Sequence, residues 1–214
     1  MQPTKQARDG LIVASFGNRG ILESADGDTH RFVLKGRKLR VVCGDEVKWD
    51  QEGSGNDARV TNFLARRNTL NRINSRGRTE LMASNLDQII VVVAASPAPD
   101  FFLVDRFLCA AELMGIDAHI VWNKTDIEAD WPAELSDFAQ LDYQILRTST
   151  TNHEGIDELR KWLAQGISML VGQSGVGKSS LINTLLPGAE VAIGPVSEAT
   201  KEGKHTTTAS IMHK

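Results

Sequence analysis

Hydrophobic residues follow two different patterns along this chain, one in each half. Between residues 10 and 64, short apolar or alternating runs end at turn residues, at intervals of roughly 8–12 positions. Such runs are typical of short strands, and five of them in succession predict a small β-barrel or sandwich. The predicted strands are Leu11–Phe16, Thr29–Leu34, Leu39–Cys43, Glu46–Trp49 and Ala58–Leu64.

The second half alternates between apolar strands and amphipathic helices. Ile89–Ala95 is a continuous apolar run, as expected for a strand buried on both faces of a parallel sheet. Phe101–Met114 has apolar residues at helical spacing and stops at Gly115. This repetition predicts an α/β fold with a doubly wound parallel sheet, whose ligands bind beyond the carboxyl ends of the strands. Further strands are predicted at Ala118–Trp122, Tyr143–Leu146 and Ile167–Val171, and further helices at Leu135–Ala139, Ile156–Leu163 and Ser179–Leu186.

The change of pattern divides the chain. The stretch between the two patterns is polar, rich in arginine and weakly periodic, which is typical of a connection. We therefore predict a β-rich domain over residues 1–68, a linker over 69–85 and an α/β domain over 86–214.

Charge is distributed unevenly between the halves. Residues 1–80 carry 15 Lys and Arg against 10 Asp and Glu, whereas residues 81–214 carry 9 against 17. Such asymmetry suggests a basic module that meets an anionic partner, although accidental surface variation is an alternative. The candidate RNA-binding residues are Arg37, Lys38, Arg40, Arg66 and Arg67.

Aromatic residues lie among the basic ones in the first half. Phe16, Phe32, Trp49 and Phe63 are interleaved with the basic stretches. Basic loops and aromatic rings on a small barrel suit single-stranded nucleic acid, through phosphate neutralisation and base stacking. The alternative is that these rings form the core of the barrel.

Composition narrows the class of protein further. The 214 residues are 41% hydrophobic and 24% charged, which is typical of a globular protein. The run Ile89–Ala95 is far shorter than the roughly 18 residues of a membrane span, and the first residues lack the apolar core of a signal peptide. Cys43 and Cys109 form no zinc-binding set. We expect a cytoplasmic monomer without a membrane partner.

A phosphate-binding motif follows the last predicted strand. Residues 172–179 read GQSGVGKS and fit the pattern GxxxxGK[ST]. In such loops, glycines let the backbone approach a phosphate, and the amides and the next helix N-terminus supply positive potential. Lys178 would reach the outer phosphates, and the Ser179 hydroxyl would bind Mg²⁺. The candidate phosphate-binding residues are Gly172, Gln173, Ser174, Gly175, Val176, Gly177, Lys178, Ser179 and Ser180.

A base-recognition motif follows an earlier strand. Asn123, Lys124, Thr125 and Asp126 come directly after Ala118–Trp122. A carboxylate only accepts hydrogen bonds, so Asp126 suits the ring N–H and exocyclic amine of guanine and leaves adenine unpaired. Lys124 would cover the base plane and Asn123 would tie the loop together. A helix start is the alternative for these four residues.

A third loop lies at the end of another strand. In Thr148-Ser149-Thr150, which follows Tyr143–Leu146, a small residue such as Ser149 would let a backbone N–H approach the guanine oxygen. An ordinary strand-end loop is the alternative.

The order of the motifs is unusual, because in ordinary GTPases the phosphate loop comes first. A protein can keep the same sheet when its original termini are joined and new termini are opened at another loop, because termini lie close together at the surface.

With these motifs, the chain resembles the circularly permuted GTPases of small ribosomal subunit biogenesis, the RsgA (YjeQ, EngC) family. The resemblance implies an N-terminal OB-fold that contacts ribosomal RNA, and hydrolysis of GTP to GDP and phosphate stimulated by the small subunit. It also implies a checkpoint role late in subunit assembly. The motifs that carry it are Arg66–Leu70, Asn85–Gln88, Asp105-Arg106, Asn123–Asp126, Gly172–Ser180 and Gly203–Thr208.

The same resemblance assigns roles near the end of the chain. It implies that Gly203–Thr208 is the first switch, in which one of three threonines, with Thr207 as the candidate, reaches Mg²⁺. His205 is a candidate catalytic group beside the reacting phosphate, together with Lys178.

The sequence also departs from the family pattern. No DxxG motif follows the phosphate loop and no cysteine follows Cys109, so the D-x-P-G motif and the expected zinc ligands are absent. We therefore expect an incomplete GTPase domain that lacks two strands and leaves Ile167–Val171 as a bare edge, prone to pairing or aggregation.

Two other functions stay open from the sequence. The chain would be a guanine-nucleotide and RNA binding module if it does not turn GTP over. It would be an ATP-using P-loop enzyme if the Asn123–Asp126 motif is accidental.

Overall fold

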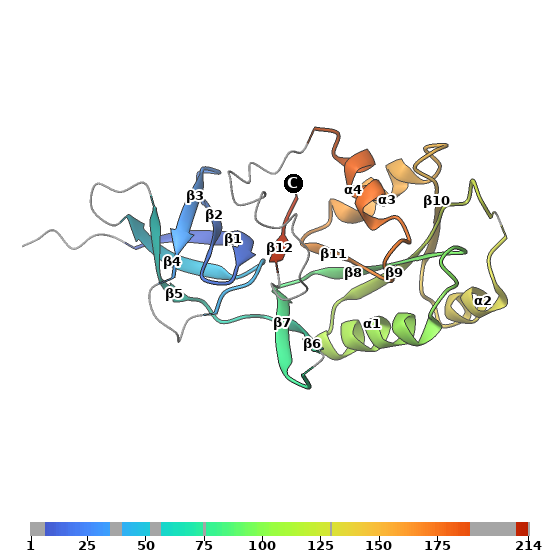
Figure 1. Ribbon diagram of the computed structural model, residues 1–214, viewed down its shortest axis with the longest axis horizontal. Coiled ribbons are helices and arrows are strands. Elements are labelled where there is room, and N and C mark those ends of the chain that lie inside the picture. Colours follow the sequence, from blue (N-terminus) through green and yellow to red (C-terminus); the bar gives the residue numbers. More distant parts are fainter. Residues whose placement is uncertain are drawn as a thin grey trace, which may run out of the picture. The chain divides into compact units, whose positions relative to one another are not determined.

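The computed structural model of the protein describes residues 7–34, 40–51, 57–74, 76–128, 130–188 and 209–213. The chain divides into two compact units (Figure 1). One unit comprises Met1–Asn85 and Glu190–Lys214, and the other comprises Leu86–Ala189.

The first unit contains a closed five-stranded barrel. Its strands pair in the order β1-β2-β3-β5-β4, and the barrel closes because β1 pairs with β4 as well as with β2. All pairings are antiparallel except that of β3 with β5. A short strand, β12 (Ala209–Ile211), adds to β1. The barrel strands are β1 (Arg8–Phe16), β2 (Arg19–Ser24), β3 (Thr29–Val33), β4 (Glu46–Gln51) and β5 (Ala58–Phe63).

The barrel interior accounts for two of the four interleaved aromatic residues. Phe32 and Trp49 are fully buried in a core with Ile12, Leu22 and Val47. Phe63 remains 38% exposed. The interpretation of the aromatics as barrel core is therefore correct for Phe32 and Trp49, which cannot offer an open face for base stacking.

Two of the predicted strand assignments are corrected. Residues 40–42 are not in a strand and Cys43 makes only an isolated bridge to Ala83, although Val41 and Val42 are buried. An apolar run can thus be buried without strand pairing. The missed strand is β2, whose buried positions are Gly20, Leu22 and Ser24. Because two of these three residues are not hydrophobic, the sequence shows no alternation of apolar and polar residues there. A Cβ at Gly20 would lie 2.1 Å from the Ala14 carbonyl oxygen, which explains the inward glycine.

The stretch expected to be a linker contains a β-hairpin. Strands β6 (Thr69–Ile73) and β7 (Thr79–Ser84) pair antiparallel, and Leu70 and Ala83 are buried. Only Leu70, Ala83 and Ser84 of the two strands are buried, so the strands show no apolar alternation in the sequence. The domain boundaries themselves remain a prediction.

The second unit is a parallel sheet wrapped by helices on both faces. Its strands are in the order β10-β9-β8-β11, and every pairing is parallel. The predicted doubly wound sheet is confirmed. The elements are β8 (Gln88–Ala94), α1 (Phe101–Met114), β9 (Asp117–Asn123), α2 (Ala133–Gln140), β10 (Ile145–Thr148), α3 (Ile156–Leu163), β11 (Ser168–Val171) and α4 (Lys178–Leu185).

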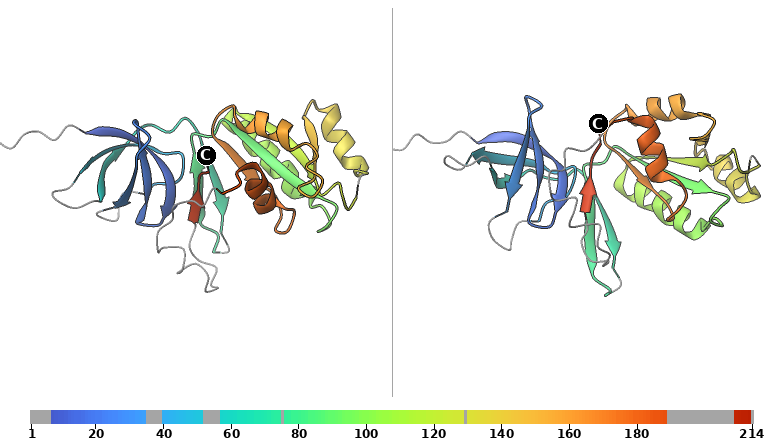
Figure 2. Two further views of the ribbon diagram at one scale, coloured as in Figure 1. Left: turned by 90° about the horizontal axis from the view of Figure 1, so that it is seen from above. Right: turned by 45° about the horizontal axis from the view of Figure 1, so that its top comes forward.

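The two faces of the sheet are covered by different helices. Ile90 and Val92 of β8 pack with Leu159 of α3 and Leu181 of α4 in one buried cluster. Helix α1 covers the opposite face, as Figures 1 and 2 show. All seven residues of β8 are buried, which is why this strand reads as a continuous apolar run.

The strand order places the chemistry-bearing loops together. From β8 the chain proceeds to β9 and β10 on one side and then returns to add β11 on the other. The loops after β8, β9, β10 and β11 therefore meet at the carboxyl edge of the sheet, on either side of the point where the winding reverses. Strand β11 lies at one end of the described sheet. None of the helices described here is long and apolar enough to cross a membrane.

Candidate nucleotide-binding site

The loop between β11 and α4 has the backbone shape that its glycines suggest. Gly172, Gly175 and Gly177 have φ values of 133°, 85° and 98°. A Cβ at Gly172 would lie 2.2 Å from the Val92 carbonyl oxygen, and one at Gly177 would lie 2.4 Å from Asn123 Nδ2. The loop curls tightly over the ends of neighbouring strands, and for this reason residues larger than glycine do not fit at these positions. Val176, fully buried in the core of the sheet, anchors its middle.

Lys178 is the first residue of α4 and folds back over the loop. Its Nζ donates to the carbonyl oxygens of Gly172 at 2.9 Å and Gln173 at 2.6 Å. Desolvation by burial lowers the pKa of Lys178 below its ordinary value. A partly desolvated ammonium beside a helix N-terminus is suited to an anion. Ser174, Ser179 and Ser180 are exposed on the same segment.

Asn123 joins the phosphate loop to the base-recognition loop. It is the last residue of β9 and is buried. Its Nδ2 donates to the Val176 carbonyl oxygen at 2.8 Å, and its Oδ1 accepts from Thr148 Oγ1 at 2.9 Å. The side chain therefore connects the loops that follow three different strands.

Lys124 makes a second connection between the same loops. Its Nζ donates to the Ser96 carbonyl oxygen at 2.8 Å and to that of Gly175 at 2.6 Å. Its backbone has a φ of 65°, a left-handed conformation that costs free energy in a residue with a Cβ. The surrounding bonds hold this conformation, which extends the lysine stem along the loops. Coverage of a base plane by that stem remains a prediction.

Asp126 is held by Ser149. The Ser149 hydroxyl donates to Asp126 Oδ1 at 2.6 Å and accepts from the backbone N–H groups of Thr151 and Asn152 at 3.2 and 3.1 Å. The hydrogen bond from Ser149 lowers the pKa of the Asp126 carboxyl. A carboxylate that stays ionised is an acceptor for two N–H donors side by side, as guanine presents them.

Glu154, which the sequence interpretation missed, and Gln173, which it placed only in the phosphate loop, support these loops. Thr125 Oγ1 lies 2.5 Å from Glu154 Oε2, which links the base-recognition loop to the loop after β10. Gln173 Oε1 accepts from the Asp100 N–H at 3.0 Å, and its Nε2 donates to the Ala98 carbonyl oxygen at 3.1 Å. Glu154 belongs to no motif, and the phosphate-loop pattern does not specify the side chain at Gln173, so no sequence signal could have identified these contacts.

The residues present fit a purine nucleotide with phosphates. A carboxylate acceptor lies in one loop, and an ammonium at a helix N-terminus lies in the adjoining loop. The Ser179 hydroxyl is exposed beside Lys178, as Mg²⁺ on a phosphate would need. Within the described ranges there is no group of three or more His, Cys, Asp or Glu residues that could hold a metal ion by itself.

Several predicted site residues lie outside the described residues: His205, Thr206, Thr207, Thr208, Arg37 and Lys38. Arg40 is described and exposed. Arg67 Nη2 donates to the Asn85 carbonyl oxygen at 2.9 Å, and the Arg67 N–H donates to Asn85 Oδ1 at 2.7 Å. Arg67 therefore holds the end of the hairpin, and its RNA contact remains a prediction.

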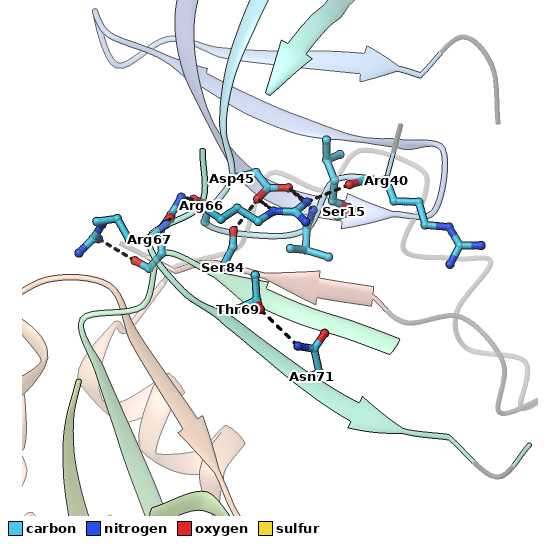
Figure 3. Close-up of polar contacts among 12 residues, drawn as sticks. Ser15, Arg40, Asp45, Arg66, Arg67, Thr69, Asn71 and Ser84 are labelled. Carbon is cyan, nitrogen blue, oxygen red and sulfur yellow. Dashed lines mark hydrogen bonds and ion pairs between the residues drawn. The ribbon is translucent and has the colours of Figure 1, made fainter. Parts of the chain in front are cut away.

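Arg66 is engaged by a buried carboxylate (Figure 3). Its Nε and Nη2 donate to the two oxygens of Asp45 at 2.6 and 2.7 Å. Asp45 is fully buried and also accepts from Ser84 Oγ at 2.6 Å and from the Val42 N–H at 3.0 Å. Asp45, which directly follows the predicted strand Leu39–Cys43 and Gly44, is the centre of a network that joins the barrel to the hairpin. The hydrogen bond to Asp45 raises the pKa of Arg66 further.

A parallel sheet in which the base-recognition motif precedes the phosphate loop defines the class: the chain has the fold of a circularly permuted GTPase. Two solved structures are similar to it. YjeQ from Thermotoga maritima matches with a TM-score of 0.67 at 30% identity, over 86% of this chain and 66% of that one. YloQ, described as a circularly permuted GTPase, matches with a TM-score of 0.59 at 21% identity over the same shares and supports the fold alone.

The family follows from the sequence comparisons. The family model "RsgA GTPase" matches residues 63–214, and the chain belongs to this family. The small ribosomal subunit biogenesis GTPase RsgA of Pseudomonas aeruginosa is 40% identical over 210 residues, covering 95% of this chain. The protein of the same name from Ectopseudomonas mendocina is 38% identical over 214 residues. The chain spans 62% of the length of both relatives. The resemblance inferred from the motifs is confirmed.

Proposed function

We propose that the protein binds GTP and hydrolyses it to GDP and phosphate, and that it acts in the cytoplasm in late maturation of the small ribosomal subunit through contact with ribosomal RNA. The observation that carries the nucleotide part is the joining of the two loops by Asn123 and Lys124. A carboxylate acceptor and a phosphate cradle are thereby held together, although they lie far apart along the chain.

Each side chain of the site has one task in this proposal. Asp126 accepts the N1–H and the 2-amino group of guanine, and the Lys124 stem lies along the base. The amides of residues 172–178 and the Lys178 ammonium bind the phosphates. As water attacks the γ-phosphorus, the bond to the β–γ bridging oxygen breaks and negative charge grows on that oxygen. Lys178 and the loop amides stabilise this charge more in the transition state than in the bound substrate.

Magnesium and the switch complete the proposed machinery. The Ser179 hydroxyl would hold Mg²⁺, which would supply neutralising charge to the phosphates. Thr207 and His205 keep the roles that the family resemblance implies. Turnover is slow until contact with the small subunit orders the switch.

Competition binding tests the nucleotide class. Labelled GDP bound to the chain should be displaced by unlabelled GDP at far lower concentration than by ADP, because ADP leaves Asp126 facing a lone pair. Equal displacement would indicate an ATP-using enzyme and contradict the proposal. GTP hydrolysis should rise when small ribosomal subunits are added. Equal rates with and without subunits would contradict stimulated hydrolysis, and binding without any turnover would reduce the protein to a binding module.

Salt dependence tests the RNA part. Association of the chain with small-subunit RNA should weaken as salt rises, with the slope set by the number of phosphates neutralised. Arg40→Gln should reduce that slope by about 1, because Arg40 is exposed on the basic unit. Arg160→Gln on helix α3 is the matched control and should leave the slope unchanged. A flat salt response of the unaltered chain would contradict phosphate contacts.

A further inference from the structure

The Thr125–Glu154 pair connects the two loops proposed to read the base. Thr125 precedes the predicted base acceptor Asp126, and Glu154 lies in the loop after β10. We propose that Thr125 and Glu154 are positioning residues for guanine selectivity, which hold Ser149 in place against the Asp126 carboxylate. This inference rests on the proposed guanine site.

The Thr125 hydroxyl has one proton and two oxygen neighbours. Glu154 Oε2 lies at 2.5 Å and the Thr148 carbonyl oxygen at 3.2 Å. The shorter distance is that of a hydroxyl donating to an ionised carboxylate, a bond about twice as strong as one between neutral groups. The Thr148 carbonyl already accepts from the Thr125 N–H at 3.2 Å. The Thr125 hydroxyl therefore donates to Glu154, while the Thr125 N–H donates to the Thr148 carbonyl oxygen. Thr125 is only 8% exposed.

The backbone of Glu154 holds the neighbouring loop. Its carbonyl oxygen accepts from the Ser149 N–H at 3.0 Å, and the two residues form an isolated antiparallel bridge. The loop between them turns sharply, with φ values of 57° at His153 and 67° at Gly155. A Cβ at Gly155 would lie 2.0 Å from the Arg147 carbonyl oxygen. This tight path keeps the Glu154 backbone on Ser149 while its carboxylate reaches Thr125.

These contacts form a closed ring. Thr125 donates to Glu154, Glu154 accepts from the Ser149 N–H, and Ser149 donates to Asp126 at 2.6 Å. Asp126 is covalently attached to Thr125, which completes the ring. The orientation of the Asp126 carboxylate therefore depends on each member, because displacing one moves the loop that supports the next.

The other oxygen of Glu154 faces a cation. Arg147 Nε lies 3.9 Å from Glu154 Oε1, and the Arg147 guanidinium lies over the Trp131 ring at 5.9 Å. The Glu154 side chain is 46% exposed, so it remains hydrated as well. Glu154 therefore faces Arg147 with one carboxylate oxygen and accepts the Thr125 hydrogen bond with the other.

Guanine selectivity is sensitive to such positioning. Asp126 must place its oxygens within hydrogen-bond distance of both the N1–H and the 2-amino group. Inosine diphosphate keeps the N1–H but lacks the 2-amino group, so the ratio of its Kd to that of GDP measures how well the second contact is made. A carboxylate that is free to rotate makes this contact less well, and the ratio then falls.

The test compares four single variants and one double variant of the full chain. Thr125→Val removes the hydroxyl and keeps the branched shape, Thr125→Ser keeps the hydroxyl, and Glu154→Ala removes the carboxylate while leaving the carbonyl for Ser149. Thr61→Val in the barrel is the matched control, since it makes the same change in a threonine whose hydroxyl donates to the Lys48 carbonyl oxygen at 3.0 Å and not to a carboxylate. The Kd values of GDP, inosine diphosphate and ADP are measured for each, together with the thermal midpoint.

Thr125→Val and Glu154→Ala should each lower the inosine-to-guanine Kd ratio by about three- to tenfold, the change expected when one charged hydrogen bond is lost indirectly. Their combination should lower it no further than either alone, since both break the same ring. Thr125→Ser and Thr61→Val should keep the ratio of the unaltered chain.

Two results would overturn the inference. One is an unchanged ratio in Thr125→Val or, should that variant not fold, in Glu154→Ala. The other is an equal weakening of all three nucleotides, which would show a general structural role. Failure of the proposed function looks different, because the unaltered chain would then fail to prefer GDP over ADP.

Discussion

The side-chain amide of Asn123 donates to the carbonyl oxygen of Val176, 53 residues further along the chain, at 2.8 Å. This bond joins the predicted base-recognition loop to the predicted phosphate loop across the carboxyl edge of the parallel sheet. It also explains why Gly177 cannot be larger, since a Cβ there would lie 2.4 Å from the same amide nitrogen.

Removing the Asn123 side chain should weaken both folding and nucleotide binding. Asn123→Ala leaves the Val176 carbonyl and the Thr148 hydroxyl without their partner in a buried site, which costs about 1–3 kcal/mol of unfolding free energy. Urea unfolding and GDP titration measure the two effects. Asn71→Ala is the control, because Asn71 is exposed and donates only to Thr69 Oγ1 at 3.2 Å (Figure 3). Equal effects of both substitutions would argue against a special role of Asn123.

The hydroxyl of Ser149 should determine how Asp126 responds to acid. The hydrogen bond from Ser149 holds the pKa of Asp126 below its ordinary value, so the carboxylate stays ionised as the pH falls until the depressed pKa is reached. In Ser149→Ala the pKa should return toward its ordinary value, and the acceptor should be lost at a higher pH. Carboxyl carbon chemical shifts of Asp126 followed through an acid titration measure this. Identical midpoints in both proteins would contradict the assignment.

The buried pair of Asp45 and Arg66 should be important for stability. Asp45→Ala removes the carboxylate acceptor of the buried Ser84 hydroxyl and leaves the Arg66 guanidinium with only its bond to the Arg40 carbonyl oxygen at 3.0 Å. Loss of one partner of a buried pair costs about 3–5 kcal/mol. The control is Asp9→Ala, since Asp9 pairs with Lys48 at 2.5 Å with side chains 62% and 37% exposed. That surface pair contributes less than about 1 kcal/mol. Denaturant midpoints that shift equally would refute the distinction.

Gln173 should affect phosphate binding without changing base selectivity. Gln173→Met removes both bonds to the segment before helix α1, so the phosphate loop becomes less well ordered before binding. GDP affinity should fall about three- to tenfold, while the GDP-to-ADP preference stays the same. Gln144→Met, at an exposed position, should change neither quantity. A loss of preference in Gln173→Met would place its effect at the base rather than at the phosphates.

The two thiols should differ strongly in reactivity. Desolvation by burial raises the pKa of Cys43 to about 11, so almost none of it is thiolate at neutral pH, whereas Cys109 is exposed on helix α1. A disulfide reagent should therefore modify one thiol rapidly in the folded protein and the second only on unfolding. Cys109→Ser should abolish the rapid phase. A rapid phase that survives this substitution would mean that Cys43 is accessible.

The helices and strands of the α/β unit were predicted to within two residues at each end, since they are long or strongly periodic. Phe101–Met114 and Ile156–Leu163 are helices with the predicted limits. The apolar run of β8 is unambiguous because helices cover both faces of the sheet. The barrel was harder, because its strands are short and one of them, β2, places a glycine and a serine inward.

The motif residues of the candidate site could be identified from the sequence, but the distant contacts that support the loops could not. Phosphate and base loops use residue types and spacings that recur wherever the same chemistry is done. Glu154 and Gln173 act through contacts at 2.5–3.1 Å whose partners lie 29 and 73–75 positions away. No local pattern specifies such pairs.

Periodicity and motif spacing were enough to establish the α/β class, the permuted order of the two loops and the family, because these follow from residue type at nearby positions. Only the tertiary structure shows that Asp45 is buried, that residues 69–85 contain a hairpin, and that Thr125 contacts Glu154. Each of these depends on which distant segments share a sheet edge or a core, and that is set by the packing of the whole unit.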